Sequence, residues 1–103
     1  MESIKRLPTH PGDVLKEELE ARGISQKQFS ERTGVPYTML NEILNGKRAV
    51  TSDFALIVEA ALGINPDMMI AMQMRYNMVQ SRLRPSMADR IQAVRKMCAS
   101  WVL

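Results

Sequence analysis

Signals that start and stop helices divide almost the whole chain into short segments, and this punctuation constrains the fold more than any other feature. Residues 65–67, Asn-Pro-Asp, combine an N-cap, a proline suited to a first turn and an acid favoured at the positive end of a helix. Glycines stand where helices are expected to end, at Gly23, Gly34 and Gly63. No stretch alternates apolar and polar residues with β-branched side chains, as a half-buried strand does. The pattern therefore predicts an all-α fold.

Apolar residues recur at helical spacing between these signals and predict six helices. Ser25 and Gln28 can form a capping box at the start of the second helix, and Pro36 suits the first turn of the third. The fifth helix is expected to be long and to be stopped by Pro85. Ser86 can then cap a sixth helix.

Length and composition exclude several classes of protein. With 103 residues, the chain has room for one compact domain and none for a separate catalytic domain. No apolar run approaches the roughly 18–20 residues that a membrane span needs, and the N-terminus lacks the apolar core of a signal peptide, so we expect a cytoplasmic protein that does not enter the membrane. The chain has one cysteine, one histidine and no glycine-rich phosphate loop, so we expect no metal site, no cofactor and no enzymatic activity.

Residues 26–45 form the most informative local pattern, because they place two short helices on either side of a turn at Gly34. A helix-turn-helix needs a small residue where the helices cross, here Ser30, and a turn residue that tolerates the left-handed backbone region. Four apolar side chains are available to wedge the second helix against the first: Phe29, Val35, Leu40 and Ile43. A plain helical hairpin uses the same packing residues, but the polar outer side of the second helix favours DNA binding.

Nine residues in and beside this motif are candidates for DNA contacts. Asn41 can pair with adenine through its amide, while Tyr37 and Thr38 lie at the end of the helix that is expected to enter the major groove. Gln26 lies at a helix start, where free N–H groups also favour a phosphate. The basic members of the set are expected to meet phosphates. The full set is Gln26, Lys27, Pro36, Tyr37, Thr38, Asn41, Asn45, Lys47 and Arg48.

Two apolar strips on the fifth helix indicate a contact surface beyond the core. One follows heptad-like steps and consists of Met69, Met72, Tyr76, Val79 and Leu83. The other has a spacing of four and consists of Ile70, Met74 and Met78. Either strip alone can be explained by core packing, but both together favour a face for a second copy of the chain. Methionine suits adaptable contacts, so a different protein is the open alternative.

The positive charge of the chain is concentrated in its last third rather than in the motif. The basic residues concerned are Arg82, Arg84, Arg90, Arg95 and Lys96. They form either a solvated face or additional phosphate contacts in a complex, and the sequence leaves both readings open. The affinity for DNA must then depend on where the basic residues of the motif point, not on the net charge of +3.

The motif and its surroundings resemble the HigA family of antitoxins, a branch of the phage-repressor-like (XRE) helix-turn-helix proteins. The resemblance covers residues 9–82, and its clearest segments are residues 10–19, 23–26, 34–36, 41–48, 60–63 and 73–77. It implies a five-helix lambda-repressor-like DNA-binding domain, which is usually dimeric. We place this domain at residues 1–84, with the helix-turn-helix at about residues 25–45, and expect residues 85–103 to form a helical extension that the family does not explain.

The resemblance also implies two activities. A HigA antitoxin binds and neutralises a cognate RelE-like mRNA-cleaving toxin, which is a small basic HigB-like protein, and it represses the operon that encodes both. The expected partners are therefore double-stranded operator DNA, the toxin and a second copy of the chain. A stand-alone helix-turn-helix repressor without a toxin is the alternative, because both classes share the motif.

Overall fold

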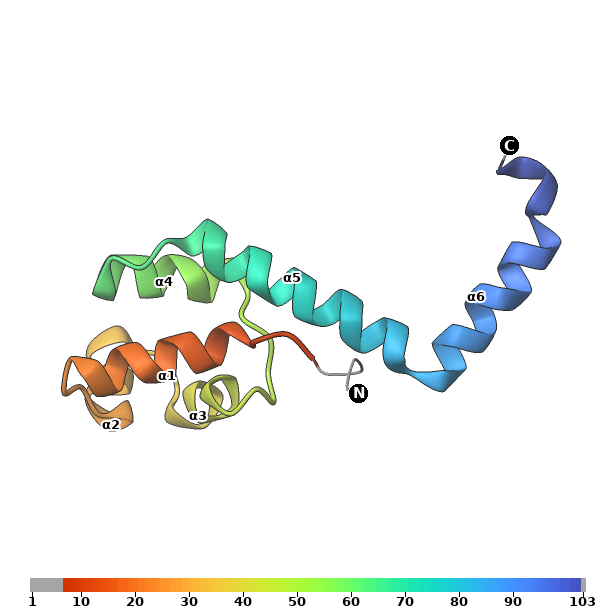
Figure 1. Ribbon diagram of the computed structural model, residues 1–103. Helices are drawn as coiled ribbons and strands as arrows, with labels where there is room; N and C mark the ends of the chain where they lie inside the picture. The colour runs from red at the N-terminus through yellow and green to blue at the C-terminus, as the bar shows by residue number, and fades with distance from the viewer. Residues whose placement is uncertain (1–6, 103) are drawn as a thin grey trace.

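The computed structural model describes residues 7–102, and within this range every regular element is a helix. The elements, in chain order, are α1 (Pro11–Ala21), α2 (Gln26–Thr33), α3 (Tyr37–Leu44), α4 (Ser52–Leu62), α5 (Pro66–Leu83), α6 (Pro85–Met97) and the short 3-10 helix η1 (Ala99–Trp101) (Figure 1). The prediction of an all-α fold is therefore confirmed, as is the prediction of a helical extension after the fifth helix.

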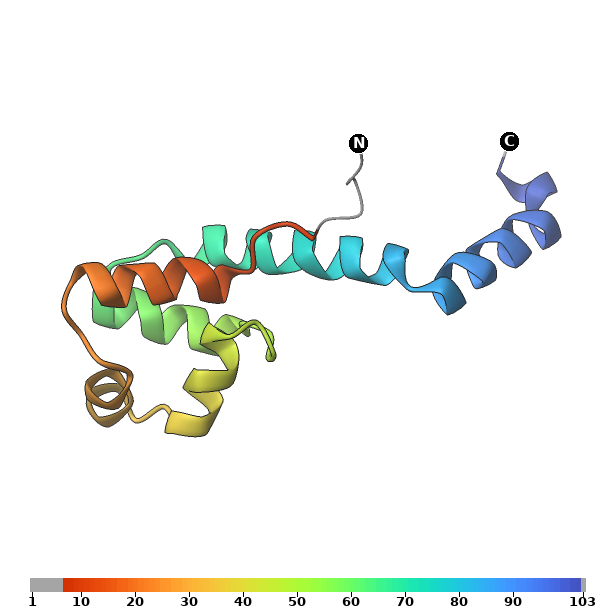
Figure 2. The same ribbon diagram turned by 60° about the horizontal axis from the view of Figure 1, so that its bottom comes forward.

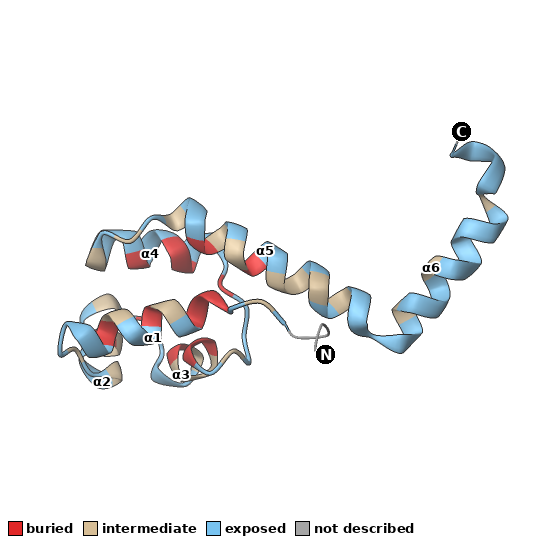
Figure 3. Ribbon diagram, viewed as in Figure 1, coloured by how far each residue is buried: buried red, intermediate tan, exposed pale blue. Residues whose placement is uncertain are grey.

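The first five helices pack together, and α6 leads away from them (Figures 1 and 2). Helix α1 packs against α3 and α5, while α2 pairs with α3 and α4 pairs with α5. The apolar core between them consists of Leu15, Leu19, Phe29, Val35, Leu40, Ile43, Leu44, Val50, Phe54, Ala55, Val58 and Met69. Figure 3 shows that the buried segments lie within this part of the molecule, whereas α6 has none.

Local capping sets most helix ends where the sequence places them. The hydroxyl of Ser25 accepts a hydrogen bond from the N–H of Gln28 at 3.0 Å, and the Gln28 Oε1 accepts one from the N–H of Ser25 at 2.9 Å, which completes the predicted capping box. Gly34 ends α2 in the left-handed region with a φ of 80°. Asn65 caps α5 through its Oδ1, which accepts from the N–H of Met68 at 3.1 Å. Each such cap contributes about 1 kcal/mol to helix stability.

Two helix starts differ from the prediction. Pro36 is the N-cap of α3 rather than a residue of its first turn, because its ψ of 137° is extended. Ser86 does not cap α6, which already begins at Pro85. The ring of a proline pushes the preceding residue out of the helical region, and Arg84 accordingly has a ψ of 126°. Pro85 therefore both ends α5 and opens α6, and the bend at Arg84 directs α6 away from the domain.

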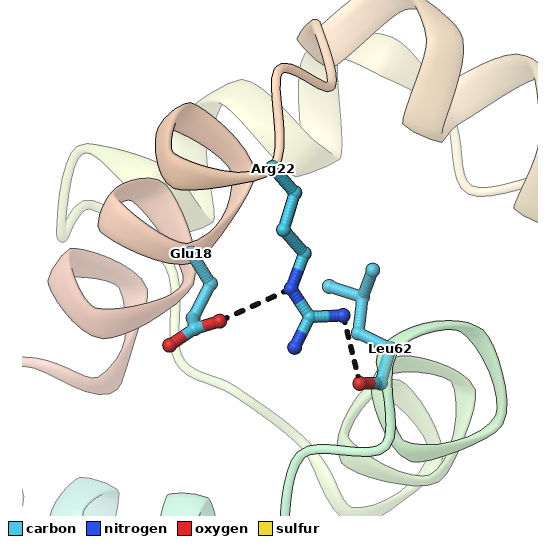
Figure 4. Close-up of polar contacts among 3 residues, drawn as sticks. All are labelled: Glu18, Arg22 and Leu62. Atoms are coloured by element: carbon cyan, nitrogen blue, oxygen red, sulfur yellow. Dashed lines mark hydrogen bonds and ion pairs between the residues drawn. The ribbon is translucent and has the colours of Figure 1, made fainter.

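Arg22 fastens the end of α1 to the end of α4 (Figure 4). Its Nη1 donates to the carbonyl oxygen of Leu62 at 2.9 Å, and its Nε donates to Oε1 of Glu18 at 3.2 Å. The last carbonyl groups of a helix have no partner within that helix, so a guanidinium suits this place. The ion pair with Glu18 is half exposed and stabilises little by itself. Its main effect is to hold the guanidinium where it can reach α4.

Gln73 holds the segment that joins α3 to α4. Its side chain is only 4% exposed, and its Oε1 accepts from the N–H of Val50 at 2.8 Å while its Nε2 donates to Oδ1 of Asn77 at 2.9 Å. A buried N–H left without a partner costs about 1–3 kcal/mol. Helix α5 therefore fixes the backbone of the segment that carries Lys47 and Arg48.

His10 makes the stability of the fold depend on pH. The ring is buried at the start of α1, where Nδ1 accepts from the N–H of Gly12 at 2.9 Å, and it packs edge-on against Tyr76 with the ring centroids 4.9 Å apart. Burial lowers the pKa of His10 from its ordinary value of 6.5, and the neighbouring carboxylate of Asp13 opposes this only in part. Because the folded state disfavours the protonated ring, the stabilisation is complete above pH 6.5 and is lost as the pH falls below that value.

We expect the urea midpoint to fall when the pH is lowered from about 7.5 to about 5.5, because histidine titrates in this interval and carboxylates largely do not. His10→Asn is the matched variant, since an amide oxygen can still cap α1 but does not titrate there. The urea midpoint of the variant is expected to fall much less than that of the wild-type protein over the same pH interval. If it kept the same pH dependence as the wild-type protein, another group would have to be responsible.

Candidate nucleic-acid interface

Helices α2 and α3 meet at an angle around the turn at Gly34 (Figure 2), and the packing between them defines which face α3 presents. The four predicted wedge residues, Phe29, Val35, Leu40 and Ile43, are all buried. Ser30, predicted as the small residue at the crossing, donates from its hydroxyl to the carbonyl oxygen of Val35 at 2.6 Å. This hydrogen bond spans the turn between the two helices. The orientation of α3 relative to α2 is therefore fixed both by apolar packing and by this bond.

The N-terminal end of α3 is open to solvent. Tyr37 is 51% exposed, and Pro36 and Thr38 on either side of it are also exposed. In helix-turn-helix proteins this end of the second helix faces the bases in the major groove. A phenol and a hydroxyl at this position can meet phosphate oxygens or thymine methyl groups.

Asn41 is the centre of a small network of amides that joins α2 to α3. Its Nδ2 donates to Oε1 of Gln26 at 3.0 Å. Asn45 in turn donates from its Nδ2 to the carbonyl oxygen of Asn41 at 2.8 Å and to its Oδ1 at 3.3 Å. An amide side chain has both donors and acceptors, so Gln26 and Asn41 orient each other and still retain groups for a base edge. The structure thus brings together three residues that the sequence predicted separately.

The predicted phosphate contacts lie at the edge of this surface. Lys27 is exposed on α2, and Lys47 and Arg48 are exposed after the end of α3. Arg48 is paired within the chain, because its Nη2 lies 2.7 Å from Oε1 of Glu42 and its Nε donates to the same oxygen at 2.8 Å. An exposed ion pair is worth about 0–1 kcal/mol, so a phosphate can replace the carboxylate. Sequence reasoning missed Glu42, whose position on α3 holds the guanidinium close to the helix.

The structure divides the heptad-like strip of α5 between the core and the surface. Met69 is 0% exposed and belongs to the core, which leaves it no surface for a partner. Met72, Tyr76 and Val79 are half-buried, and Leu83 at the end of the helix is exposed. The part of this strip that a partner can reach therefore begins at Met72.

The second strip follows the same trend. Ile70 packs against the core, whereas Met74 and Met78 are exposed. Neither strip is wholly internal, because α5 continues beyond the helices that cover its first half (Figure 3).

The sequence singled out five basic residues in the last third of the chain, and all of them are exposed: Arg82, Arg84, Arg90, Arg95 and Lys96.

Comparisons with known proteins agree with this geometry. A family model described as helix-turn-helix (HTH_3) matches residues 15–69. The antitoxin HigA-1 of Vibrio cholerae is 33% identical to this chain over 85 residues, which cover 82% of this chain and 80% of the antitoxin.

Solved structures with a similar fold include two antitoxins of the HigA family. An addiction module antidote protein of the HigA family from Coxiella burnetii is 28% identical, with a TM-score of 0.71 over 85% of this chain and 95% of that one. The Pseudomonas aeruginosa antitoxin HigA, solved with the higBA promoter, is 21% identical, with a TM-score of 0.72 over 84% of this chain and 92% of that one. Within residues 7–102, no helix combines the length and apolarity needed to cross a bilayer.

Proposed function

The chain belongs to the HigA family of helix-turn-helix antitoxins, and on that premise we propose that it represses its own operon by binding operator DNA and neutralises the toxin that the operon encodes. It is a regulator and not an enzyme. The observation that carries the DNA-binding half is the amide pair of Gln26 and Asn41, held at 3.0 Å beside the exposed start of α3.

The DNA-binding half requires two copies of the chain. One helix-turn-helix unit contacts too little DNA for tight binding, so a dimer on a near-palindrome is proposed, with half-sites about 34–36 Å apart or a multiple of that. Helix α3 lies in the major groove, Asn41 and Gln26 read a base edge, and Lys27, Lys47 and Arg48 contact phosphates. The Pseudomonas aeruginosa antitoxin HigA, which has a similar fold and was solved with the higBA promoter, supports promoter binding by a chain of this fold.

The antitoxin half rests on the similarity to HigA-1 of Vibrio cholerae, which extends over 82% of this chain and so beyond the helix-turn-helix itself. The proposed partner is a small basic RelE-like toxin that cleaves mRNA. The reachable part of the α5 strip, namely Met72, Tyr76, Val79 and Leu83, is the proposed contact surface for a second copy or for this toxin. The strip is half-buried from Met72 to Val79 and exposed at Leu83, which supports a role outside the domain core.

The test is to express the protein encoded next to this chain, alone and together with it. We expect the neighbour to stop growth when expressed alone, and this chain to restore growth and to copurify with it. Arg48→Ala is the control variant, because it alters the DNA-facing side and is expected to restore growth as well as the wild type. If the neighbour has no effect on growth and does not copurify while operator binding persists, the chain is a stand-alone repressor.

A further inference from the structure

Helix α6 has an apolar face that residues 7–102 cover only in part: Met87 and Ile91 next to α5 are half-buried, and Val94 is 50% exposed. Every residue of α6 is described and none is buried, as Figure 3 shows along the whole helix. Its apolar residues Met87, Ile91 and Val94 follow steps of four and three and therefore share one face. Met97, the last residue of α6, and Trp101, in the following η1, are 83% and 82% exposed. Isolated helices shorter than about 12–15 residues are marginal in water, so a helix of 13 residues needs a partner surface.

The charges of the chain are separated in a way that points to that surface. Residues 49–74, which include all of α4 and the first half of α5, contain Asp53, Glu59 and Asp67 but no lysine, arginine or histidine. In α6, by contrast, three basic side chains accompany a single acid. A basic, apolar helix and an acidic stretch of chain are thus present in the same molecule.

The outer face of α4 is both apolar and acidic. Phe54, Ala55 and Val58 point into the core, whereas Leu56 and Ile57 are 54% and 37% exposed. The two acids of this helix, Asp53 and Glu59, are exposed with them. Arg22 is a cation that does reach the end of α4, but its guanidinium is already bonded to Glu18 and to the Leu62 carbonyl. The exposed side of α4 therefore complements α6 in charge and in apolarity.

The two surfaces cannot meet within one chain. Helix α5 carries α6 away from α4, and the molecule is 55 Å long as a result (Figure 1). Helix α6 also points away from the proposed DNA-binding helices. Helices α2 and α3 lie at the bottom of both views, while α6 rises toward the top (Figures 1 and 2). A basic toxin is a poor occupant for a basic helix, because like charges repel across an interface.

We propose that two copies of this chain exchange their C-terminal helices, so that the apolar face of α6 from each copy docks on the outer face of α4 in the other. The complementary charges are Arg90 and Arg95, which flank the apolar face of α6, and Asp53 and Glu59 on α4. Such a contact is the same in both directions and closes after two copies. The inference rests on the dimer of the proposed function and assigns its interface.

The exchange doubles each contact, because both copies give a helix and receive one. A helix of 13 residues is about 20 Å long, and two such contacts are made in each dimer. Stable interfaces bury about 800 Å² per partner. The surfaces that each copy offers toward this area are α6, the outer face of α4 and the exposed end of α5, which lies next to α6.

Charge reversal on the two helices tests the exchange. The variants are Glu59→Lys, on α4, and Arg95→Glu, on α6, both at exposed positions where the fold tolerates the change. Each variant alone places like charges in both contacts, and its self-association constant, measured by sedimentation, is expected to fall about tenfold. An equimolar mixture of the two is expected to recover wild-type association, because one contact is then native and the other has its charges swapped.

Recovery in the mixture can arise only between chains, so it separates the exchange from a contact of α6 with its own domain. Lys16→Glu, at an exposed position on α1 away from both surfaces, is the control and is expected to leave association unchanged. The proposal is overturned if the mixture associates no better than its components, or if the wild-type chain is a monomer. It is also overturned if Arg95→Glu weakens only DNA binding or only toxin binding. If a dimer forms without α6 and still binds the operator, the exchange of α6 is wrong but the proposed function holds.

Discussion

Gly12→Ala is expected to destabilise the domain by about 3 kcal/mol or more, because it overpacks a place where two backbones touch. The first turn of α1 lies directly against the end of α3. A Cβ on Gly12 would overlap the carbonyl oxygen of Ile43 and would lie 2.9 Å from both the carbonyl carbon of Ile43 and Nδ1 of His10. A backbone carbonyl cannot rotate away as a side chain can, so α1 must move relative to α3. The total stability of a small domain is only about 5–15 kcal/mol, which makes this a large fraction.

Urea unfolding followed by circular dichroism measures the loss, and Gly23→Ala is the matched control. Gly23 has a φ of 66°, but nothing lies within 4 Å of an added Cβ, so this change carries only the left-handed backbone cost of roughly 1–2 kcal/mol. We expect Gly12→Ala to lower the midpoint clearly more than Gly23→Ala does. Equal effects would mean that α1 and α3 can separate without loss, and the close approach at Gly12 would not limit stability.

The helix ends could be predicted because their causes are local. A capping box depends on two residues three positions apart, and Ser25 and Gln28 both stand in the sequence where it needs them. The sequence misplaces the start of α6 because Pro85 serves two purposes, ending one helix and opening the next. Ser86 is a suitable cap by residue type, yet the proline before it already holds the geometry of a first turn.

Contacts between distant residues could not be predicted in the same way. The spacing of Met69 fits a surface strip as well as a core position, and only the packing of α1 and α4 on α5 decides that it is buried. Gln26 and Asn41 were both identified as candidate DNA contacts, but the bond between them depends on the angle at which α2 and α3 cross. The pair of Glu42 and Arg48 likewise depends on how the chain turns after α3. The sequence thus nominates the residues of the candidate site, whereas their mutual arrangement comes only from the structure.

Asn41→Ala is expected to relax the base preference at one position of each operator half-site while leaving the fold intact. A good amide-to-adenine pair is worth about 1–3 kcal/mol of discrimination, which is about 5- to 150-fold in relative affinity. The side chain is only half-buried, and its removal leaves the buried wedge beneath α3 unchanged. Arg48→Ala provides the contrast, because a lost phosphate contact weakens binding to every sequence alike and reduces the salt slope by about one unit.

Fluorescence anisotropy against the operator and its single-base variants, at several salt concentrations, separates these two outcomes. The amide network gives Asn41 a second possible role, since its Nδ2 also holds Oε1 of Gln26. If Asn41→Ala keeps the wild-type preference, Asn41 is not the residue that reads the base, and Gln26 is the next candidate at the same place. Gln26→Ala then has to relax the preference that Asn41→Ala left intact. If neither change alters it, the amide pair braces α2 against α3, and base reading falls to the exposed residues at the start of α3.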